Sequence, residues 1–214
     1  MEIRVARNIL SLNDSLANRV RAELERRDVV LLNLLASPGA GKTSLILALA
    51  KCLEGQLRIG VIEGDLASRV DADRVAAAGL PVIQINTEGG CHLEARQIAD
   101  ALPRLPLDAL DLLIIENVGN LVCTASYDLG EDLRVVLASV PEGHDKPWKY
   151  PKIFLEPDAV VVTKTDLEPH VDYDAAAFEA AVRSVNRDVP ILRVSVKTGE
   201  GLDSLASWLL ARVR

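Results

Sequence analysis

A glycine-rich segment between two apolar stretches constrains this chain more than any other feature. The sequence reads A-S-P-G-A-G-K-T-S from Ala36 to Ser44. Residues 29–35 before it and 45–50 after it are almost entirely apolar. A buried strand, a glycine-rich turn and a helix in this order form the context of a phosphate-binding loop. The segment therefore predicts a site for nucleotide phosphates, in which Ala36 stands where the pattern G-x-x-x-x-G-K-[ST] has its first glycine.

The chemistry of such a loop comes from its backbone amides, one lysine and one hydroxyl. Amide N–H groups at the helix N-terminus point at the anion, and the helix dipole adds partial positive charge there. Lys42 is expected to reach the β- and γ-phosphates, and the Thr43 hydroxyl to bind Mg²⁺. The predicted phosphate-binding residues are Gly39, Ala40, Gly41, Lys42, Thr43 and Ser44.

Apolar segments alternate with amphipathic ones over the rest of the chain. After residues 29–35, strands are predicted at 57–63, 81–86, 111–116, 133–140, 159–162 and 191–194. Beyond the helix of the phosphate-binding loop, helices are predicted at 9–27, 67–78, 92–101, 174–186 and 202–212. This order predicts an α/β fold, with a mostly parallel seven-stranded sheet and helices on both of its faces. No repeat or linker interrupts it, so we expect a single P-loop domain over residues 1–214.

Residues 1–27 are predicted to form a helical segment that packs on this domain. Five apolar residues recur there at helical spacing and are expected to make the packed face: Ile9, Leu12, Leu16, Val20 and Leu24. Later in the chain, residues 141–152 are predicted to form a long loop. Its lysines and aromatic residues either close over the nucleotide, meet a partner, or are simply exposed.

Two acidic residues follow predicted strands, where an open parallel sheet binds its ligand. Asp65 follows the second strand, and Glu116 ends the fourth. Their expected roles are to hold Mg²⁺, directly or through water, and to orient the attacking water. Asp65 can alternatively cap the helix predicted at 67–78. Lys42, Asp65 and Glu116 are the predicted catalytic residues, and Thr43, Asp65 and Glu116 the predicted magnesium ligands.

The segment E-N-V-G-N that begins at Glu116 resembles the D-x-x-G switch of GTPases, with Glu in place of Asp. The amide of Gly119 can bond the γ-phosphate and so sense its loss. No glutamine follows this glycine to position water, so slow intrinsic hydrolysis is expected.

Two short segments after the sixth and seventh strands indicate the base. T-K-T-D at 163–166 is placed like the GTPase motif N-K-x-D, with Thr163 in place of Asn. The carboxylate of Asp166 can accept from N1–H and N2–H₂ of guanine together, which is worth ~1–3 kcal/mol by analogy with base-edge contacts. S-V-K at 195–197 is placed like a loop that presents N–H to guanine O6. The predicted base-binding residues are Thr163, Lys164, Asp166, Ser195, Val196 and Lys197, and together they favour GTP over ATP.

Cys91 and His92 follow two glycines after the third strand, and Cys123 comes just beyond the fourth. Thiolate and imidazole ligands suit Zn²⁺ or Ni²⁺. Three ligands leave either an open coordination position or a site shared across a two-fold dimer. The alternative is that Cys91 and Cys123 are small core residues, which is the interpretation we favour for Cys52.

Charge and composition exclude other classes of protein. The net charge is −7, which argues against nucleic acid as a partner because phosphate backbones require clustered Lys and Arg. No stretch approaches the length of a membrane span, and the N-terminus lacks the apolar core of a signal peptide. Three cysteines at uneven spacing make a disulfide framework unexpected. We therefore expect a soluble, cytoplasmic protein that binds neither nucleic acid nor membrane.

Taken together, the motifs resemble those of the hydrogenase nickel-incorporation GTPases (HypB), in the branch of P-loop GTPases that includes the urease accessory GTPase. The similar segments extend over nearly the whole chain: S-P-G-A-G-K-T-S, E-G-D-L-A-S-R-V-D-A-D-R, N-T-E-G-G-C-H-L-E-A, E-N-V-G-N-L-V-C, E-G-H-D-K-P-W-K-Y-P-K and T-K-T-D-L. The resemblance implies a GTP-dependent homodimer that loads nickel into the large subunit of [NiFe]-hydrogenase with a zinc-bearing accessory protein, HypA. It also implies that Cys91, His92 and Cys123 form the metal site at the dimer interface.

The sequence departs from this family in two respects. Some members carry a further His four residues beyond the Cys-His pair, where this chain has Arg96. The Cys-rich and His-rich nickel motifs of other members are absent from the sequence. The resemblance therefore implies nickel binding at the GTPase-domain site without nickel storage. The rival hypotheses are a chaperone for another metalloenzyme such as urease, a P-loop small-molecule kinase, and a metal sensor with a vestigial nucleotide site.

Overall fold

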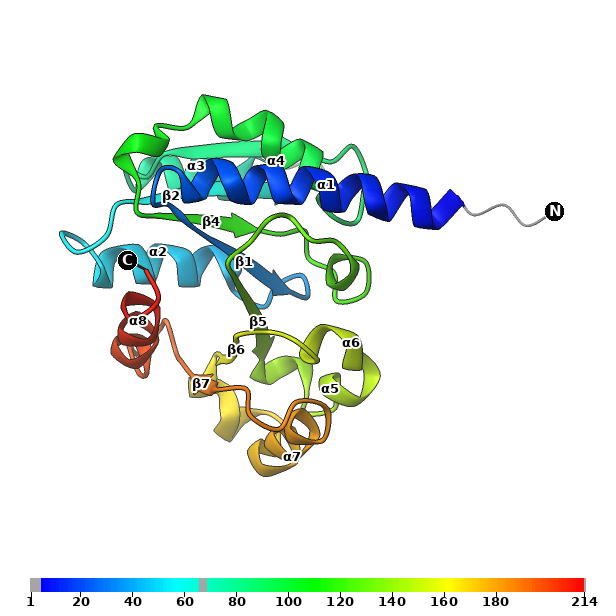
Figure 1. Cartoon of the computed structure of the whole chain (residues 1–214). Coiled ribbons are helices and arrows are strands. Elements are labelled where there is room, and N and C mark those ends of the chain that lie inside the picture. Colours follow the sequence, from blue (N-terminus) through cyan, green and yellow to red (C-terminus); the bar gives the residue numbers. More distant parts are fainter. Residues whose placement is uncertain (1–4, 66–68, 214) are drawn as a thin grey trace.

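Seven parallel strands form one sheet, in the order β3-β2-β4-β1-β5-β6-β7 (Figure 1). The computed structural model describes residues 5–65 and 69–213, with side chains from residue 11 onward. The strands are β1 (Val30–Ala36), β2 (Ile59–Asp65), β3 (Val82–Asn86), β4 (Leu112–Glu116), β5 (Leu133–Ser139), β6 (Ala159–Thr163) and β7 (Ile191–Arg193). The predicted α/β fold with a seven-stranded sheet is confirmed, and every strand pair is parallel.

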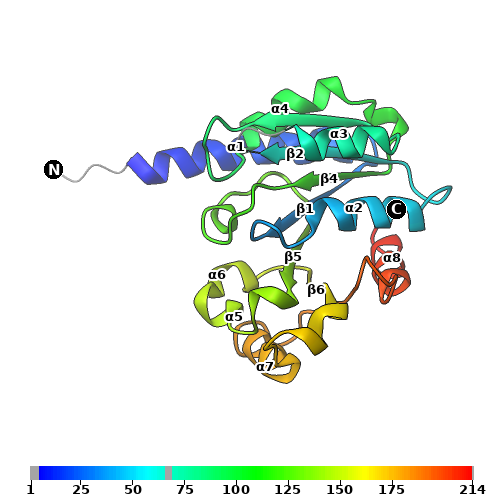
Figure 2. The same cartoon turned by 180° about the vertical axis from the view of Figure 1, so that it is seen from behind.

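Helices cover both faces of the sheet. They are α1 (Val5–Glu25), α2 (Lys42–Cys52), α3 (Val70–Ala77), α4 (Ala95–Ala101), α5 (Lys146–Lys149), α6 (Pro151–Phe154), α7 (Ala175–Val185) and α8 (Leu202–Leu210). Short 3₁₀ turns are η1 (Leu102–Arg104), η2 (Leu107–Ala109), η3 (Thr124–Ser126), η4 (Val140–Glu142) and η5 (Thr165–His170). Figures 1 and 2 show α1 beside α4, and α2 beside α8.

Alternation along β1 explains why both faces are apolar. Leu32 and Leu34 point into a core with α2, α3 and α8. Leu31 and Leu35 point to the opposite face, where one cluster packs against α1 and α4 and another against α6 and α7. Because successive side chains of a strand point to opposite faces, a central strand covered on both sides must be apolar at nearly every position.

The boundaries of several predicted elements were wrong, among them the N-terminal helix, predicted at 9–27 and observed at Val5–Glu25. The helix predicted at 92–101 begins at Ala95, because Glu94 and Gln97 form a reciprocal capping box at its start. The helix predicted at 67–78 is α3, which begins at Val70, and residues 66–68 lie outside the described part. The segment 141–152, predicted as a loop, contains part of η4, all of α5 and the start of α6.

The packed face of α1 agrees with the predicted one at Val20 and Leu24 but differs from it at Leu12, and the side chain of Ile9 lies outside the described residues. Leu12 is 65% exposed, whereas Asn13 is 5% exposed and Ala17, Val20 and Leu24 are buried. Asn13 is tolerated there because both ends of its amide are bonded. Its Nδ2 donates to the carbonyl of Asp128 at 2.7 Å, and its Oδ1 accepts from the N–H of Ala95 at 2.9 Å.

We predict that Asn13→Ala lowers the free energy of unfolding by about 1–3 kcal/mol, because it leaves a partly buried carbonyl and a buried N–H without partners. The matched control is Asn18→Ala on the same helix, where the side chain is exposed and bonds only Arg21 among the described residues. The free energy of unfolding of this control variant should stay within about 0.5 kcal/mol of the wild-type value. Urea unfolding of both variants makes the comparison, and equal losses would contradict the bracing role of Asn13.

Candidate functional site

The carboxyl ends of all seven strands lie at one edge of the sheet, since every strand is parallel. A cavity of about 220 Å³ opens at this edge. It is lined by Pro38, Gly39, Lys42, Glu63, Gly64, Asp65, Asp71, Glu116, Asn117, Val118 and Gly119. The structure thus brings together Lys42, Asp65, Glu116 and Gly119, which the sequence had suggested separately.

The loop between β1 and α2 turns at two glycines. Gly39 and Gly41 have φ values of 75° and 97°, in the left-handed region that glycine enters without strain. Gly41 leads directly into α2, so Lys42 and Thr43 form its first turn. Lys42 is only 9% exposed. Burial lowers its pKa, although the negative charge of Glu116 acts in the opposite direction. Ala36, at the first position of the loop, is fully buried in the core.

Gly119 lies directly against this loop. A Cβ at Gly119 would come within 2.8 Å of the Pro38 backbone, so no larger residue fits without movement. Asn120 follows, and its Oδ1 accepts hydrogen bonds from the N–H groups of Val122 and Cys123. The chain after β4 therefore contacts the phosphate-binding loop at Gly119 and fixes Cys123 a few residues later.

Two buried glutamates lie opposite each other on the neighbouring strands β2 and β4. Glu63 of β2 pairs in register with Glu116 of β4, and the two are 2% and 5% exposed. Burial, with the nearby charges of Glu116 and Asp65, raises the pKa of Glu63 to about 8. Burial also raises the pKa of Glu116, which accepts a hydrogen bond from Thr43 Oγ1 at 2.8 Å.

The oxygen donors of this cavity fit a hard divalent cation such as Mg²⁺. Thr43 and Glu116 are already in contact, and Asp65 lines the same space. One oxygen of Glu63 and one of Glu116 are buried with no hydrogen-bond partner among the described residues. Unpaired buried carboxylate oxygens are costly unless a cation or a proton compensates them.

The sequence analysis missed Glu63 and Asp71. Glu63 interrupts an otherwise apolar strand two positions before Asp65, so both side chains point to the same face; this was the available signal. Asp71 lies in the first turn of α3. That helix begins at Val70 with Arg69 at its N-cap position, so the alternative role of Asp65 as its cap was wrong.

The segment after β6 is bonded to the phosphate-binding loop. Thr163 Oγ1 donates to the carbonyl of Ala40, and Lys164 Nζ to that of Gly39, both at 2.7 Å. Thr163 therefore supports the loop although it stands in place of asparagine. Lys164 adopts a left-handed conformation, with φ 59°.

The carboxylate of Asp166 is oriented by the segment after β7. Ser195 Oγ donates to Asp166 Oδ1 at 2.6 Å. Lys197 Nζ lies 3.9 Å from the other oxygen, while Val196 is exposed. The two candidate base-binding segments are thus joined at the same edge of the sheet as Lys42.

Cys91, His92 and Cys123 also meet at this edge. Their ligand atoms all lie within 4.8 Å of one another, and His92 Nδ1 is 3.6 Å from Cys91 Sγ. The hydrogen bond with the Cys91 thiol raises the pKa of Cys123. The three residues are half-buried, and neither Cys91 nor Cys123 packs in any of the three core clusters of the described residues, so the alternative of Cys91 and Cys123 as core residues is not supported. Cys52 is half-buried on α2 against the core.

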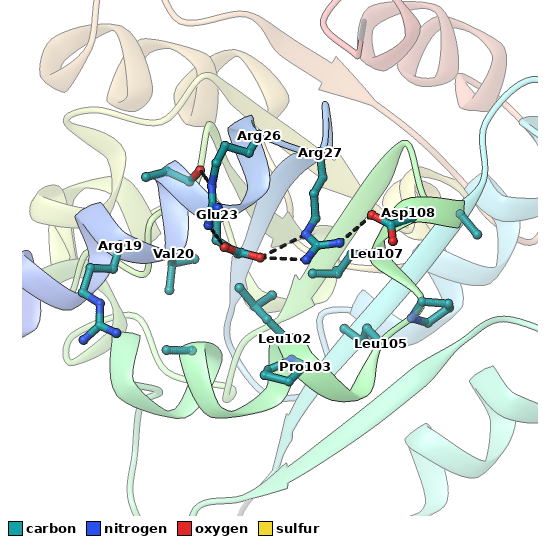
Figure 3. A pocket seen from close by; sticks show the side chains of 14 residues that line it. Arg19, Val20, Glu23, Arg26, Arg27, Leu102, Pro103, Leu105, Leu107 and Asp108 are labelled. Atoms are coloured by element: carbon teal, nitrogen blue, oxygen red, sulfur yellow. Dashed lines mark hydrogen bonds and ion pairs between the residues drawn. The ribbon is translucent and has the colours of Figure 1, made fainter.

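A larger cavity lies elsewhere in the described part of the chain (Figure 3). This groove of about 990 Å³ runs between the end of α1 and residues 99–109. Glu23 and Arg27 pair on the α1 side of the groove, and Arg27 also pairs with Asp108 on the other side. The segments that line it lead into the amino ends of β1 and β4, so it lies at the edge opposite the phosphate-binding loop.

Comparisons with known proteins agree with this geometry. The sequence model of the family described as CobW/HypB/UreG, nucleotide-binding domain, matches residues 30–193. The hydrogenase maturation factor HypB of Escherichia coli (strain K12) is 46% identical over 202 residues, which cover 94% of this chain and 70% of that protein. The hydrogenase/urease maturation factor HypB of Helicobacter pylori is 37% identical, and the match covers 100% of this chain and 89% of that one.

Two crystal structures have closely similar folds. HypB from Helicobacter pylori in complex with nickel has a TM-score of 0.91 at 37% identity, covering 94% of this chain and 95% of that one. HypB from Archaeoglobus fulgidus has a TM-score of 0.90 at 35% identity, covering 96% and 100%.

The fold and the glycine-rich loop define a nucleotide-binding domain of the P-loop class. The chain belongs to the CobW/HypB/UreG family of such domains and, within it, to the HypB maturation factors. The resemblance inferred from the motifs is thereby confirmed. None of the helices in the described part of the chain has both the length and the apolar character needed to cross a lipid bilayer.

We predict that the pKa of Glu63 makes stability depend on pH. Its pKa is about 8 in the folded protein against 4.5 ordinarily, so between these values the folded state binds more protons than the unfolded state. Stability therefore falls as the pH rises through this window. Glu63→Gln removes that fall, so the variant gains stability over wild type from pH 5 to pH 8. Urea unfolding without nucleotide, in EDTA, tests this.

The control for this measurement is Glu54→Gln, which changes an exposed glutamate on the turn after α2. The free energy of unfolding of this variant should change with pH in parallel with that of wild type from pH 5 to pH 8. A Glu63→Gln curve that is also parallel to wild type would contradict the assignment.

Proposed function

We propose that this chain is a GTP-binding and GTP-hydrolysing metallochaperone that inserts nickel during maturation of [NiFe]-hydrogenase. The observation that carries the proposal is the placement of Cys91, His92 and Cys123, within 4.8 Å of one another, at the sheet edge that holds the phosphate-binding loop. The names of the relatives support the target enzyme, and the nickel complex of a 37% identical relative supports the metal. Residues 1–214 act as one domain in this proposal.

The nucleotide half of the proposal assigns a role to each residue of the cavity. The amides of residues 39–44 and the Lys42 ammonium bind the β- and γ-phosphates. Thr43, Asp65 and Glu116 hold Mg²⁺, which neutralises charge on the phosphate oxygens when bound. Asp65 and Glu116 also orient the attacking water. Since no glutamine follows Gly119 to position that water, intrinsic turnover is slow.

The base is read by the segments at 163–166 and 195–197. Asp166 accepts from the guanine N1–H and N2–H₂, and the bond from Ser195 holds its carboxylate in place. Lys164 donates from Nζ to the carbonyl of Gly39 in the phosphate-binding loop, and the stem of its side chain packs over the base. These contacts favour GTP over ATP and oppose the alternative of a small-molecule kinase.

Nickel is the cargo in this proposal, and zinc is the competing ion for the same donors. Two thiolates and one imidazole leave a coordination position open. That position is filled either by a water or by a second copy of the chain, so the site suits a homodimer formed with GTP. The proposed partners are the zinc-bearing accessory protein HypA and the hydrogenase large subunit, in the cytoplasm, with neither nucleic acid nor membrane as a partner.

The nucleotide and metal halves are coupled through the chain after β4. Gly119 touches the phosphate-binding loop at Pro38, and Asn120 holds the backbone of Cys123. Gain or loss of the γ-phosphate at Gly119 therefore moves a metal ligand. Such coupling by ordering of a segment is a known kind of switch.

A second candidate function is delivery of nickel to urease. It is favoured by one observation, the name of the Helicobacter pylori relative as a hydrogenase/urease maturation factor. The metal site is the same in both cases, so only the apo-enzyme that accepts the nickel distinguishes the two functions. Transfer of ⁶³Ni to purified apo-hydrogenase large subunit and to apo-urease separates the two.

We predict that Asp166→Asn weakens GTP binding about 5- to 150-fold, because one of the two guanine contacts is lost. ATP binding should not change. The control is Asp172→Asn, an exposed aspartate beyond η5. Fluorescent nucleotide titration measures both, and unchanged GTP affinity in Asp166→Asn would support a nucleotide site that does not read guanine.

We predict that Cys91→Ser abolishes tight nickel binding, since a thiolate ligand is replaced by a hydroxyl. Cys52→Ser is the matched control, because that thiol is on α2 and away from the site. Isothermal titration with Ni²⁺ of wild type and both variants is the decisive experiment. A Cys91→Ser variant that binds nickel like wild type would refute the proposed metal site.

A further inference from the structure

His92 is in contact with the segment that carries Cys123. Its ring stacks on the ring of Tyr127, with centroids 3.9 Å apart and planes 23° from parallel. Tyr127 follows η3, the 3₁₀ turn that begins directly after Cys123. The stack therefore joins the segment of Cys91 and His92 to the segment of Cys123.

One buried side chain of α1 binds the backbone on both sides of this stack. The amide of Asn13 accepts from the N–H of Ala95, three residues beyond His92, and donates to the carbonyl of Asp128, next to Tyr127. The Asp128 carboxylate also pairs with Arg21 of α1 at 3.1 Å. Helix α1 thus sets the distance between the two segments whose rings meet.

The other contacts of the His92 ring do not fix its plane once a metal binds. Its Nδ1 is bonded to Cys91 Sγ, but a metal that takes both atoms as ligands replaces this bond. Its Nε2 is buried and has no hydrogen-bond partner among the described residues, and it lies 3.8 Å from a carboxylate oxygen of Glu94. The stack on Tyr127 uses neither ring nitrogen, so it persists when a metal binds.

We propose that Tyr127 is a positioning residue for His92. Its ring holds the imidazole so that Nδ1 faces the space between the two thiols, and Asn13 holds the two segments at the separation that the stack needs. Without the ring, the thiols remain but the imidazole can turn away from the metal. The inference rests on the proposed function, since it takes Cys91, His92 and Cys123 as nickel ligands.

Tyr127→Leu and Tyr127→Phe test the proposal by nickel titration and by the absorption spectrum of bound Ni²⁺. Leucine keeps an apolar side chain against the core but lacks the flat ring, and we expect nickel affinity to fall about 10- to 100-fold, as for other supporting groups of metal ligands. Phenylalanine keeps the ring and should retain wild-type affinity and spectrum. Tyr150→Leu, at a half-buried tyrosine between α5 and α6, is the control and should bind nickel like wild type.

A double-mutant cycle with His92→Ala distinguishes positioning from general damage. If Tyr127 acts through His92, the variant with both changes binds nickel no more weakly than His92→Ala alone. The spectrum of Tyr127→Leu should also match that of His92→Ala. Thermal unfolding and GTP affinity of each variant confirm that the fold is retained.

Three results would overturn the inference. They are wild-type affinity and spectrum in Tyr127→Leu, a loss that adds fully to that of His92→Ala, and an equal loss in Tyr127→Phe. Any of these, found while Cys91→Ser still abolishes binding, rejects the role of Tyr127 and leaves the proposed function standing. Nickel binding that is indifferent to Cys91→Ser rejects both.

Discussion

The position of β4 between β1 and β2 is the constraint on which the whole site depends. It places Glu116 next to Thr43 on one side and in register with Glu63 on the other. The chain that leaves β4 then passes the phosphate-binding loop at Gly119 and reaches Cys123. One strand therefore supplies the acid of the nucleotide cavity and leads into a metal ligand, so the two sites share a backbone as well as an edge.

Much of this arrangement could be predicted from the sequence because the signals are local. Apolar runs followed by turns gave the strands, and parallel strands require their carboxyl ends to meet at one edge. The candidate site residues Lys42, Thr43, Asp166 and Cys91 were found because each lies shortly after a strand or a glycine turn. The structure places them where that reasoning put them; their roles remain proposals.

What could not be predicted depends on contacts between distant segments. The pairing of Glu63 with Glu116 follows from strand order, which no local pattern encodes. The burial of Asn13 in place of Leu12 depends on two backbone groups far along the chain that bond its amide. The role of Tyr127 was not predicted, because an aromatic residue after a cysteine is no sequence signal for a metal site. Its importance follows only from the stack with the His92 ring.

The central claim is that the nucleotide controls the metal site. It is tested most directly by measuring Ni²⁺ affinity at Cys91, His92 and Cys123 in the nucleotide-free protein, with GDP, and with Mg²⁺ and a non-hydrolysable GTP analogue. Because Gly119 and Cys123 belong to one segment, the account predicts a different affinity with the analogue than with GDP. The same affinity in all three forms would contradict it.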